Sequence, residues 1–144
     1  MIGVVLDATE GRWAQVTSKL GPHGYTIPPT RDPKGTILEG DEAKPTVGVW
    51  IMPDNVSQGM LEDFLLPGAP PGGVEVAREA VELAKKKEVA TFKDVHHSKA
   101  VIHTYLAWQD EPGRPLGLSV TSKLLSAETP AAKRFIAWLT RLFP

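Results

Sequence analysis

Residues 47–55, VGVWIMPDN, carry the strongest indication of the fold. The first six residues of this stretch form a continuous apolar run, and the turn-forming residues Pro53-Asp54-Asn55 end it. Continuous apolar runs are typical of strands that are buried on both faces, as in parallel sheets with helices above and below. A second run of this kind covers residues 2–6 and ends at Asp7. We therefore predict an α/β fold with a mainly parallel sheet flanked by helices.

The remaining elements are predicted from the spacing of apolar residues and from the Gly and Pro residues that end helices and strands. An apolar stripe predicts a helix over residues 10–20, and a Gly- and Pro-rich connection holds short strands over residues 25–27 and 36–39. Ser57 is a candidate cap for a short helix carrying residues 60–65. Three longer helices are predicted over residues 75–87, 98–108 and 131–143, so the strands come before most of the helices.

Composition restricts the class of protein. A chain of 144 residues, 42% of them hydrophobic, fits one domain with a single core over residues 1–144. The formal net charge of −1 provides no global attraction to nucleic acid or to an anionic membrane. The absence of cysteine excludes disulfides and thiol chemistry. We find no secretory signal and no apolar run long enough to span a bilayer, so we expect a cytoplasmic protein without a membrane partner.

Acidic residues follow both apolar runs. Asp7 ends the first and Asp54 follows the second, with Glu62 and Asp63 a little further along the chain. Open α/β sheets place their sites outside the carboxyl ends of the strands, and clustered carboxylate oxygens suit Mg²⁺ or Mn²⁺. We therefore predict that these four acids are metal ligands. The alternative is that Asp7 and Asp54 only cap helices or form turns.

A basic segment precedes the helix predicted over residues 98–108. If that helix begins near His96, then His96, Lys99 and His103 share one of its faces. A lysine with two imidazoles can hold a phosphate or stabilise charge in a transition state. We take Lys99 and His96 as candidate catalytic residues. The alternative is a solvated polar face opposite an inward apolar stripe that runs from Val101 to Trp108.

Several segments together resemble a known family. They are residues 47–55 (VGVWIMPDN), residues 59–65 (GMLEDFL), Ser98-Lys99-Ala100, and residues 106–109 (LAWQ). They resemble an uncharacterised bacterial family, a domain of unknown function related to Toprim domains and kin of the overcoming-lysogeny-defect type nucleases. The resemblance covers most of the chain and implies a single Toprim-like α/β domain.

The resemblance also implies a site. Toprim domains carry a glutamate after an early strand and an Asp-x-Asp after a later one, and these acids bind Mg²⁺. Asp7 matches the first acid of the Asp-x-Asp, Thr9 stands at the second, and the pair Glu62-Asp63 resembles the later acidic motif of the nuclease branch. Lys99 matches the position of its catalytic lysine. The glutamate would lie upstream of Ile2, so we expect the first strand-helix unit to be missing and the site to be incomplete.

Two main classes of function remain open from the sequence. The first is a Toprim-related, metal-dependent domain that acts on nucleic-acid phosphodiesters. The second is a non-catalytic binding or regulatory module that retains the fold, which Thr9 and the near-zero net charge favour. A phosphotransferase of the haloacid-dehalogenase kind is a weaker third hypothesis, because it requires an aspartate where Thr9 stands. An unpaired strand edge at residues 2–6 would also suit a homodimer.

Overall fold

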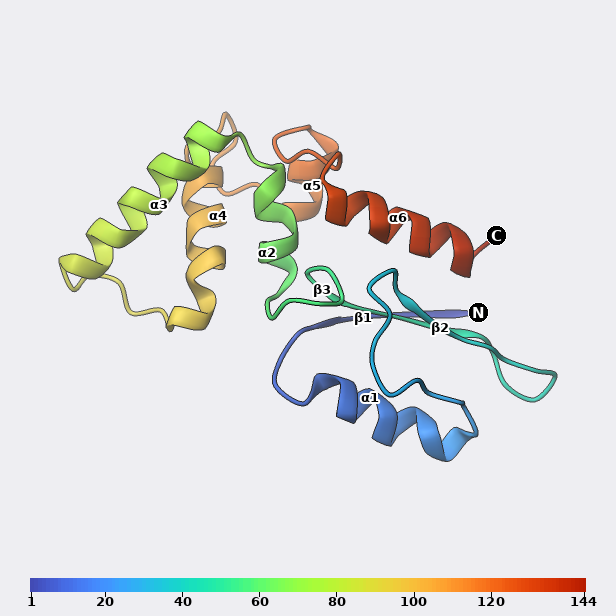
Figure 1. Cartoon of the computed structure of the whole chain (residues 1–144). Helices are drawn as coiled ribbons and strands as arrows, with labels where there is room; N and C mark the ends of the chain where they lie inside the picture. Colours follow the sequence, from blue (N-terminus) through green and yellow to red (C-terminus); the bar gives the residue numbers. More distant parts are fainter. The chain divides into compact units, whose positions relative to one another are not determined.

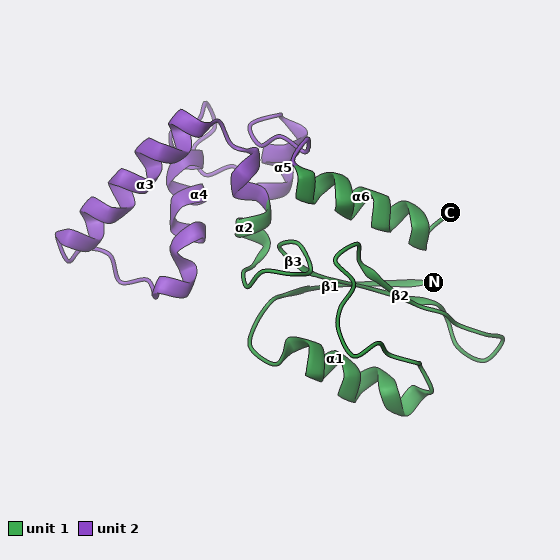
Figure 2. Ribbon diagram, in the orientation of Figure 1, with its two compact units in different colours: residues 1–64, 130–144 green, residues 65–129 purple.

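The computed structural model describes all residues, Met1–Pro144, and the chain forms two compact units. Unit 1 comprises residues 1–64 and 130–144 and contains every strand, whereas unit 2 comprises residues 65–129 and is helical (Figures 1 and 2). None of the helices combines the length and apolar character needed to cross a membrane. The prediction of a single domain over the whole chain stays a prediction.

The sheet of unit 1 has three strands in the order β1-β3-β2. β1 (Ile2–Asp7) runs parallel to β3 (Val47–Met52), and β2 (Thr36–Leu38) runs antiparallel to β3. The α/β class is therefore confirmed, but the sheet is mixed rather than mainly parallel. The register pairs Ile2 with Val47 and Asp7 with Met52, so the two parallel strands end at the same edge of the sheet.

Two helices of unit 1 cover the two faces of this sheet. α1 (Arg12–Leu20) lies against one face and α6 (Pro130–Leu142) against the other (Figure 1). Side chains of β3 alternate between the two faces, as strand geometry requires. Val49 joins the cluster that contains Val16 of α1. On the other face, the ring of Trp50 lies 5.2 Å from that of Phe135 and 5.7 Å from that of Trp138.

The prediction that both apolar runs are covered on both faces is correct for β3 and wrong for β1. Every residue of β3 is buried. In β1, by contrast, Ile2 is 48% exposed and Val5 is 46% exposed. β1 lies at an edge of the sheet and has β3 as its one neighbour. The side chains of β1 are therefore less buried than those of β3, although the two strands have similar sequences.

Unit 2 is built around two packed helices. α3 (Pro71–Lys86) and α4 (His97–Ala107) bury one apolar cluster, to which Leu125 also belongs. α2 (Leu61–Leu65) leads into this unit, and α5 (Leu116–Thr121) follows α4. Short 3₁₀ turns occupy Gly21–His23, Leu66–Gly68 and Asp94–His96.

Several sequence-based boundaries need correction. Residues 25–27 form no strand. This segment is held by a side-chain contact rather than by backbone pairing with a strand, since the Tyr25 hydroxyl donates to the carbonyl of Pro45 at 2.6 Å. The sequence does not predict α5, since its short sequence LGLSVT carries no clear helical period. Trp108 does not continue the inward stripe that begins at Val101, because it follows the end of α4 and is half-exposed.

Candidate functional site

The carboxyl edge of the sheet brings Asp7 to the start of α2. Ala8 forms an isolated bridge with Gly59, in which the Ala8 N–H donates to the Gly59 carbonyl at 2.8 Å. The Leu61 N–H then donates to Oδ1 of Asp7 at 3.1 Å. Because the first turn of α2 carries Glu62 and Asp63, three of the four predicted metal ligands belong to this junction. We call Asp7, Asp54, Glu62 and Asp63 the carboxylate edge.

Asp54 organises the turn that follows β3. Its Oδ1 accepts the N–H groups of Val56 at 3.0 Å and Ser57 at 2.7 Å, and its Oδ2 accepts the Ser57 hydroxyl at 3.1 Å. Partial burial acts to raise the pKa of Asp54, but these hydrogen bonds, helped by the positive charge of Arg134, outweigh it and lower the pKa. Ser57 belongs to this turn and does not cap α2, which corrects its predicted role.

Glu62 and Asp63 are held within the protein rather than extended into solvent. Glu62 is buried. Oδ2 of Asp63 accepts the Met60 N–H at 2.8 Å, which supplies a partner for a donor at the start of α2. Gly59 permits this arrangement: its φ is +151°, and a Cβ there would lie 2.8 Å from Oδ2 of Asp63. Asp63 therefore shapes the start of α2.

The carboxylate edge does not form a compact ligand set. No three His, Asp or Glu side chains of the chain are gathered closely enough to hold a metal ion. Asp7, Asp54 and Asp63 each accept a backbone N–H, and for Asp7 and Asp54 this is the turn and cap chemistry that the sequence left open as the alternative. A metal-binding role for the four acids stays a prediction.

Two arginines lie against this edge. Nε of Arg12 donates to the carbonyl of Asp7 at 3.0 Å. The Nη2 atom of Arg31 donates to the carbonyl of Val56 and, at 3.5 Å, to that of Ser57. The edge thus combines carboxylates with guanidinium groups, a mixture that reduces its net negative charge.

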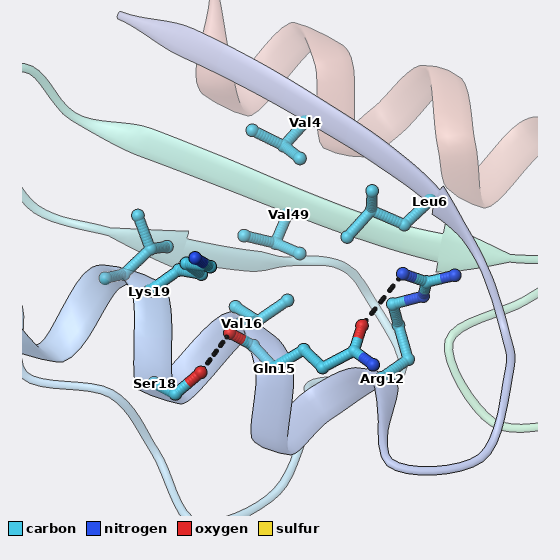
Figure 3. Close-up of a pocket in the computed structure, with 9 residues that line it drawn as sticks. Val4, Leu6, Arg12, Gln15, Val16, Ser18, Lys19 and Val49 are labelled. Carbon is cyan, nitrogen blue, oxygen red and sulfur yellow. Dashed lines mark hydrogen bonds between the residues drawn. The ribbon is translucent and has the colours of Figure 1, made fainter.

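An apolar pocket of about 340 Å³ lies on the α1 face of the sheet. Val4, Leu6 and Val49 line it from the strands, and Val16 lines it from α1 (Figure 3). At one end, Nη1 of Arg12 donates to Oε1 of Gln15 at 2.9 Å, so polar groups border an apolar floor. This composition is typical of binding pockets.

The two predicted catalytic residues belong to unit 2. His96 lies in the 3₁₀ turn Asp94–His96, one residue before α4, and Lys99 lies in the first turn of α4. Both are exposed. The sequence does not single out the neighbouring His97, yet its Nε2 lies 2.8 Å from Oε1 of Glu82 and links α4 to α3. The catalytic roles of His96 and Lys99 stay predictions.

Comparison with known families matches the whole chain to one of them. The matching family model is described as "Protein of unknown function (DUF3226)" and covers residues 1–144. The chain belongs to this family. No curated protein and no solved structure matches the chain. The expectation of an uncharacterised family is therefore confirmed.

Within this DUF3226 chain, Asn55 is the site residue whose role the sequence does not reveal. Its side chain is 2% exposed and its φ is +64°. Its Oδ1 accepts the N–H of Ile51 at 2.7 Å, and its own N–H donates to the Ile51 carbonyl at 2.8 Å. Asn tolerates the left-handed region better than most residues, so the Pro53-Asp54-Asn55 string was the available signal.

Proposed function

We propose that the chain is a Toprim-related binding domain, which binds phosphodiester groups of nucleic acid without cleaving them. The observation that supports this most directly is the use of its carboxylates. Three of the four acids, Asp7, Asp54 and Asp63, accept backbone N–H groups, and Asp54 accepts two of them. A carboxylate whose oxygens accept the backbone N–H groups of a turn is less available to coordinate a metal ion together with other acids.

Divalent-metal catalysis makes strict demands on such a site. Mg²⁺ requires near-octahedral oxygen ligands at about 2.0–2.1 Å, and it usually retains several waters beside one or two carboxylates. The three-acid set of the Toprim pattern, one glutamate and an Asp-x-Asp, has no counterpart in this chain, where no three acids are gathered in one place. Thr9, at the position of the second acid of Asp-x-Asp, supports the same interpretation.

The Toprim relationship is supported by the order of elements and motifs. Two parallel strands end together, β1 at Asp7 and β3 two residues before Asp54, and the short helix α2 with Glu62 and Asp63 comes next. The segments of resemblance, residues 47–55 and 59–65, comprise β3 with its turn and the segment that forms α2. Toprim domains act on nucleic acid, so a member that lacks the complete acid set would retain binding and lose cleavage.

Gel-shift and cleavage assays on the same labelled oligonucleotides test the proposal. We expect a shifted complex that forms with EDTA present, and no cleavage with Mg²⁺ or Mn²⁺. Asp7→Ala should leave the shift unchanged, and Glu39→Ala, an exposed acid away from this edge, serves as its control. The absence of any shift with single- or double-stranded DNA or RNA would refute the binding proposal.

A metal-dependent nuclease is the second candidate, and one specific observation favours it. Oδ1 of the exposed Asp7 lies 3.1 Å from the Leu61 N–H, which brings this carboxylate to the helix that carries Glu62 and Asp63. In this case the four acids of unit 1 would hold Mg²⁺ or Mn²⁺. Cleavage that requires metal and disappears in Asp7→Ala, but persists in Glu39→Ala, would establish it in place of the first.

A further inference from the structure

A second pocket in unit 1, of about 390 Å³, is lined by cationic side chains and by no carboxylate. Its lining residues are Lys34, Arg134, Ala137 and Arg141, and we call this the basic pocket. The chain has almost no net charge, so a pocket bordered by three cations is a local departure from the average surface. Such a departure is the electrostatic feature expected of an anion site.

The basic pocket is positioned by α6. Arg134, Ala137 and Arg141 occur at intervals of three and four residues, so they share one face of the helix. The short Ala137 side chain lies between the two arginines and leaves space there. Lys34 completes the pocket from the segment that precedes β2.

The segment that carries Lys34 is locked against α6. Gly35 has φ +87°, and a Cβ at this position would lie 2.3 Å from Cδ1 of Trp138, so only glycine allows this approach. The Trp138 indole N–H donates to the Thr36 carbonyl at 3.4 Å, and Oδ1 of Asp32 accepts the Lys34 N–H at 2.7 Å. The backbone at Lys34 is therefore fixed before any ligand arrives.

Arg141 also helps to hold residues 34–35 against α6, and part of its guanidinium remains available as a hydrogen-bond donor. Its Nη2 donates to the carbonyls of Lys34 and, at 3.2 Å, of Gly35. A guanidinium carries five N–H donors, and Nη1 and Nε have no hydrogen bond here. An arginine that is held by backbone carbonyls loses less freedom when it binds an anion.

The other two cations are not neutralised by ion pairs. The Lys34 ammonium and the Arg134 guanidinium take part in no hydrogen bond or salt bridge, and the charge of Arg134 acts on Asp54 only through space. Planar guanidinium groups match the geometry of phosphate oxygens, while lysine acts as a point charge. We propose that the basic pocket binds a phosphate group of a nucleic-acid backbone. This inference rests on the proposed nucleic-acid binding and assigns its binding surface to α6.

Salt-dependent binding of the whole chain to fluorescein-labelled DNA oligonucleotides, single- and double-stranded, tests the inference. The variant Lys34→Gln/Arg134→Gln should bind about two- to tenfold more weakly, as for partly exposed charge pairs. The slope of log affinity against log salt should fall by about 0.7 to 0.9 for each phosphate that the variant no longer neutralises. Arg141 is left intact because it holds the backbone of residues 34–35, and circular dichroism checks that the variant is folded.

The matched control is Lys86→Gln/Lys87→Gln, which changes the net charge equally on exposed positions of unit 2. This control should keep the wild-type slope. Equal weakening in both variants, or wild-type binding by the pocket variant, would overturn the inference and leave the proposed function standing. Failure of the wild type to bind any oligonucleotide would refute both. If the chain binds inorganic phosphate through Lys34 and Arg134 but binds no oligonucleotide, the ligand of the basic pocket is a small anion and the inferred nucleic-acid ligand is wrong.

Discussion

β1 and β3 have similar sequences but differ in how deeply the fold buries them. Both are six-residue strands made mostly of apolar side chains, and they run parallel in register. β3 lies in the centre of the sheet with every residue buried, whereas β1 lies at the edge with Ile2 and Val5 about half-exposed. A continuous apolar run therefore predicts a strand, whereas the elements packed around that strand determine how much of it is buried.

The ends of the two strands differ in the same way. β3 runs into a turn that is closed by Asp54 and by the buried Asn55. β1 runs into the exposed Asp7, whose carboxylate accepts one N–H, that of Leu61. Stability is therefore expected to depend on β3 and its turn, while the end of β1 is left more open to solvent.

The largest contrast is expected from truncating one side chain in each strand. Trp50→Ala in β3 should cost about 3–5 kcal/mol in the free energy of unfolding, because it empties a fully buried site that packs against Phe135 and Trp138. Val5→Ala in β1 should cost less than about 1 kcal/mol. Urea unfolding followed by circular dichroism measures both. Equal destabilisation would show that β1 is as buried in solution as β3.

Two glycines that are partners in the register provide a closely matched pair. A Cβ on Gly48 would lie 2.3 Å from Cδ2 of the buried Leu142 and 2.9 Å from a ring carbon of Trp138, so Gly48→Ala should destabilise by about 1–3 kcal/mol. A Cβ on Gly3 would meet its nearest atom at 3.4 Å. Gly3→Ala should therefore be neutral or stabilise by up to about 1 kcal/mol. Thermal unfolding of the two variants compares them, and a stable Gly48→Ala protein would argue against this packing of α6.

The turn after β3 is expected to contribute an effect of similar size. Asn55→Gly keeps access to the positive φ but removes the acceptor of the buried Ile51 N–H, which should cost about 1–3 kcal/mol. Asn55→Ala should cost more, because it adds strain in the left-handed region. Asp7→Ala, at the end of β1, is the comparison variant and should be destabilised by less than about 1 kcal/mol. An effect as large as that of Asn55→Gly would contradict the contrast between the two strand ends.

The smallest effect is expected from the charge of Asp54. Its pKa is lower in the folded protein, so its contribution is complete above the pKa of an unfolded aspartate, about 3.9, and is lost as the pH falls through the folded value. Asp54→Asn should thus be less stable than wild type at neutral pH, by less than about 1 kcal/mol since the group is partly exposed. The gap should close below about pH 4. Unfolding curves across this range measure it, with Asp7→Asn as the control.

The candidate site is predictable from the sequence in part. The two apolar runs place Asp7 and Asp54 after two strands, and the register confirms that these strands end together. The hydrogen-bond partners of the carboxylates are not predictable, because each carboxylate accepts from whichever donor the fold brings near it. The Leu61 N–H that reaches Asp7 lies 54 residues away in the sequence. The basic pocket escapes prediction for the same reason, since Lys34 and Arg141 meet only after α6 packs over the sheet.

The local elements of this protein are predictable from short stretches of sequence: the strand over residues 47–52, the helices that carry an apolar stripe, and the acids at the ends of the two apolar runs. These depend on the properties of neighbouring residues and on their spacing. The folded chain is needed to know which strands lie at the edges of the sheet, which carboxylates accept the N–H groups of turns, and where cationic side chains gather without acids. Those properties depend on contacts between residues far apart in the chain, whose partners are set by the packing of the whole unit.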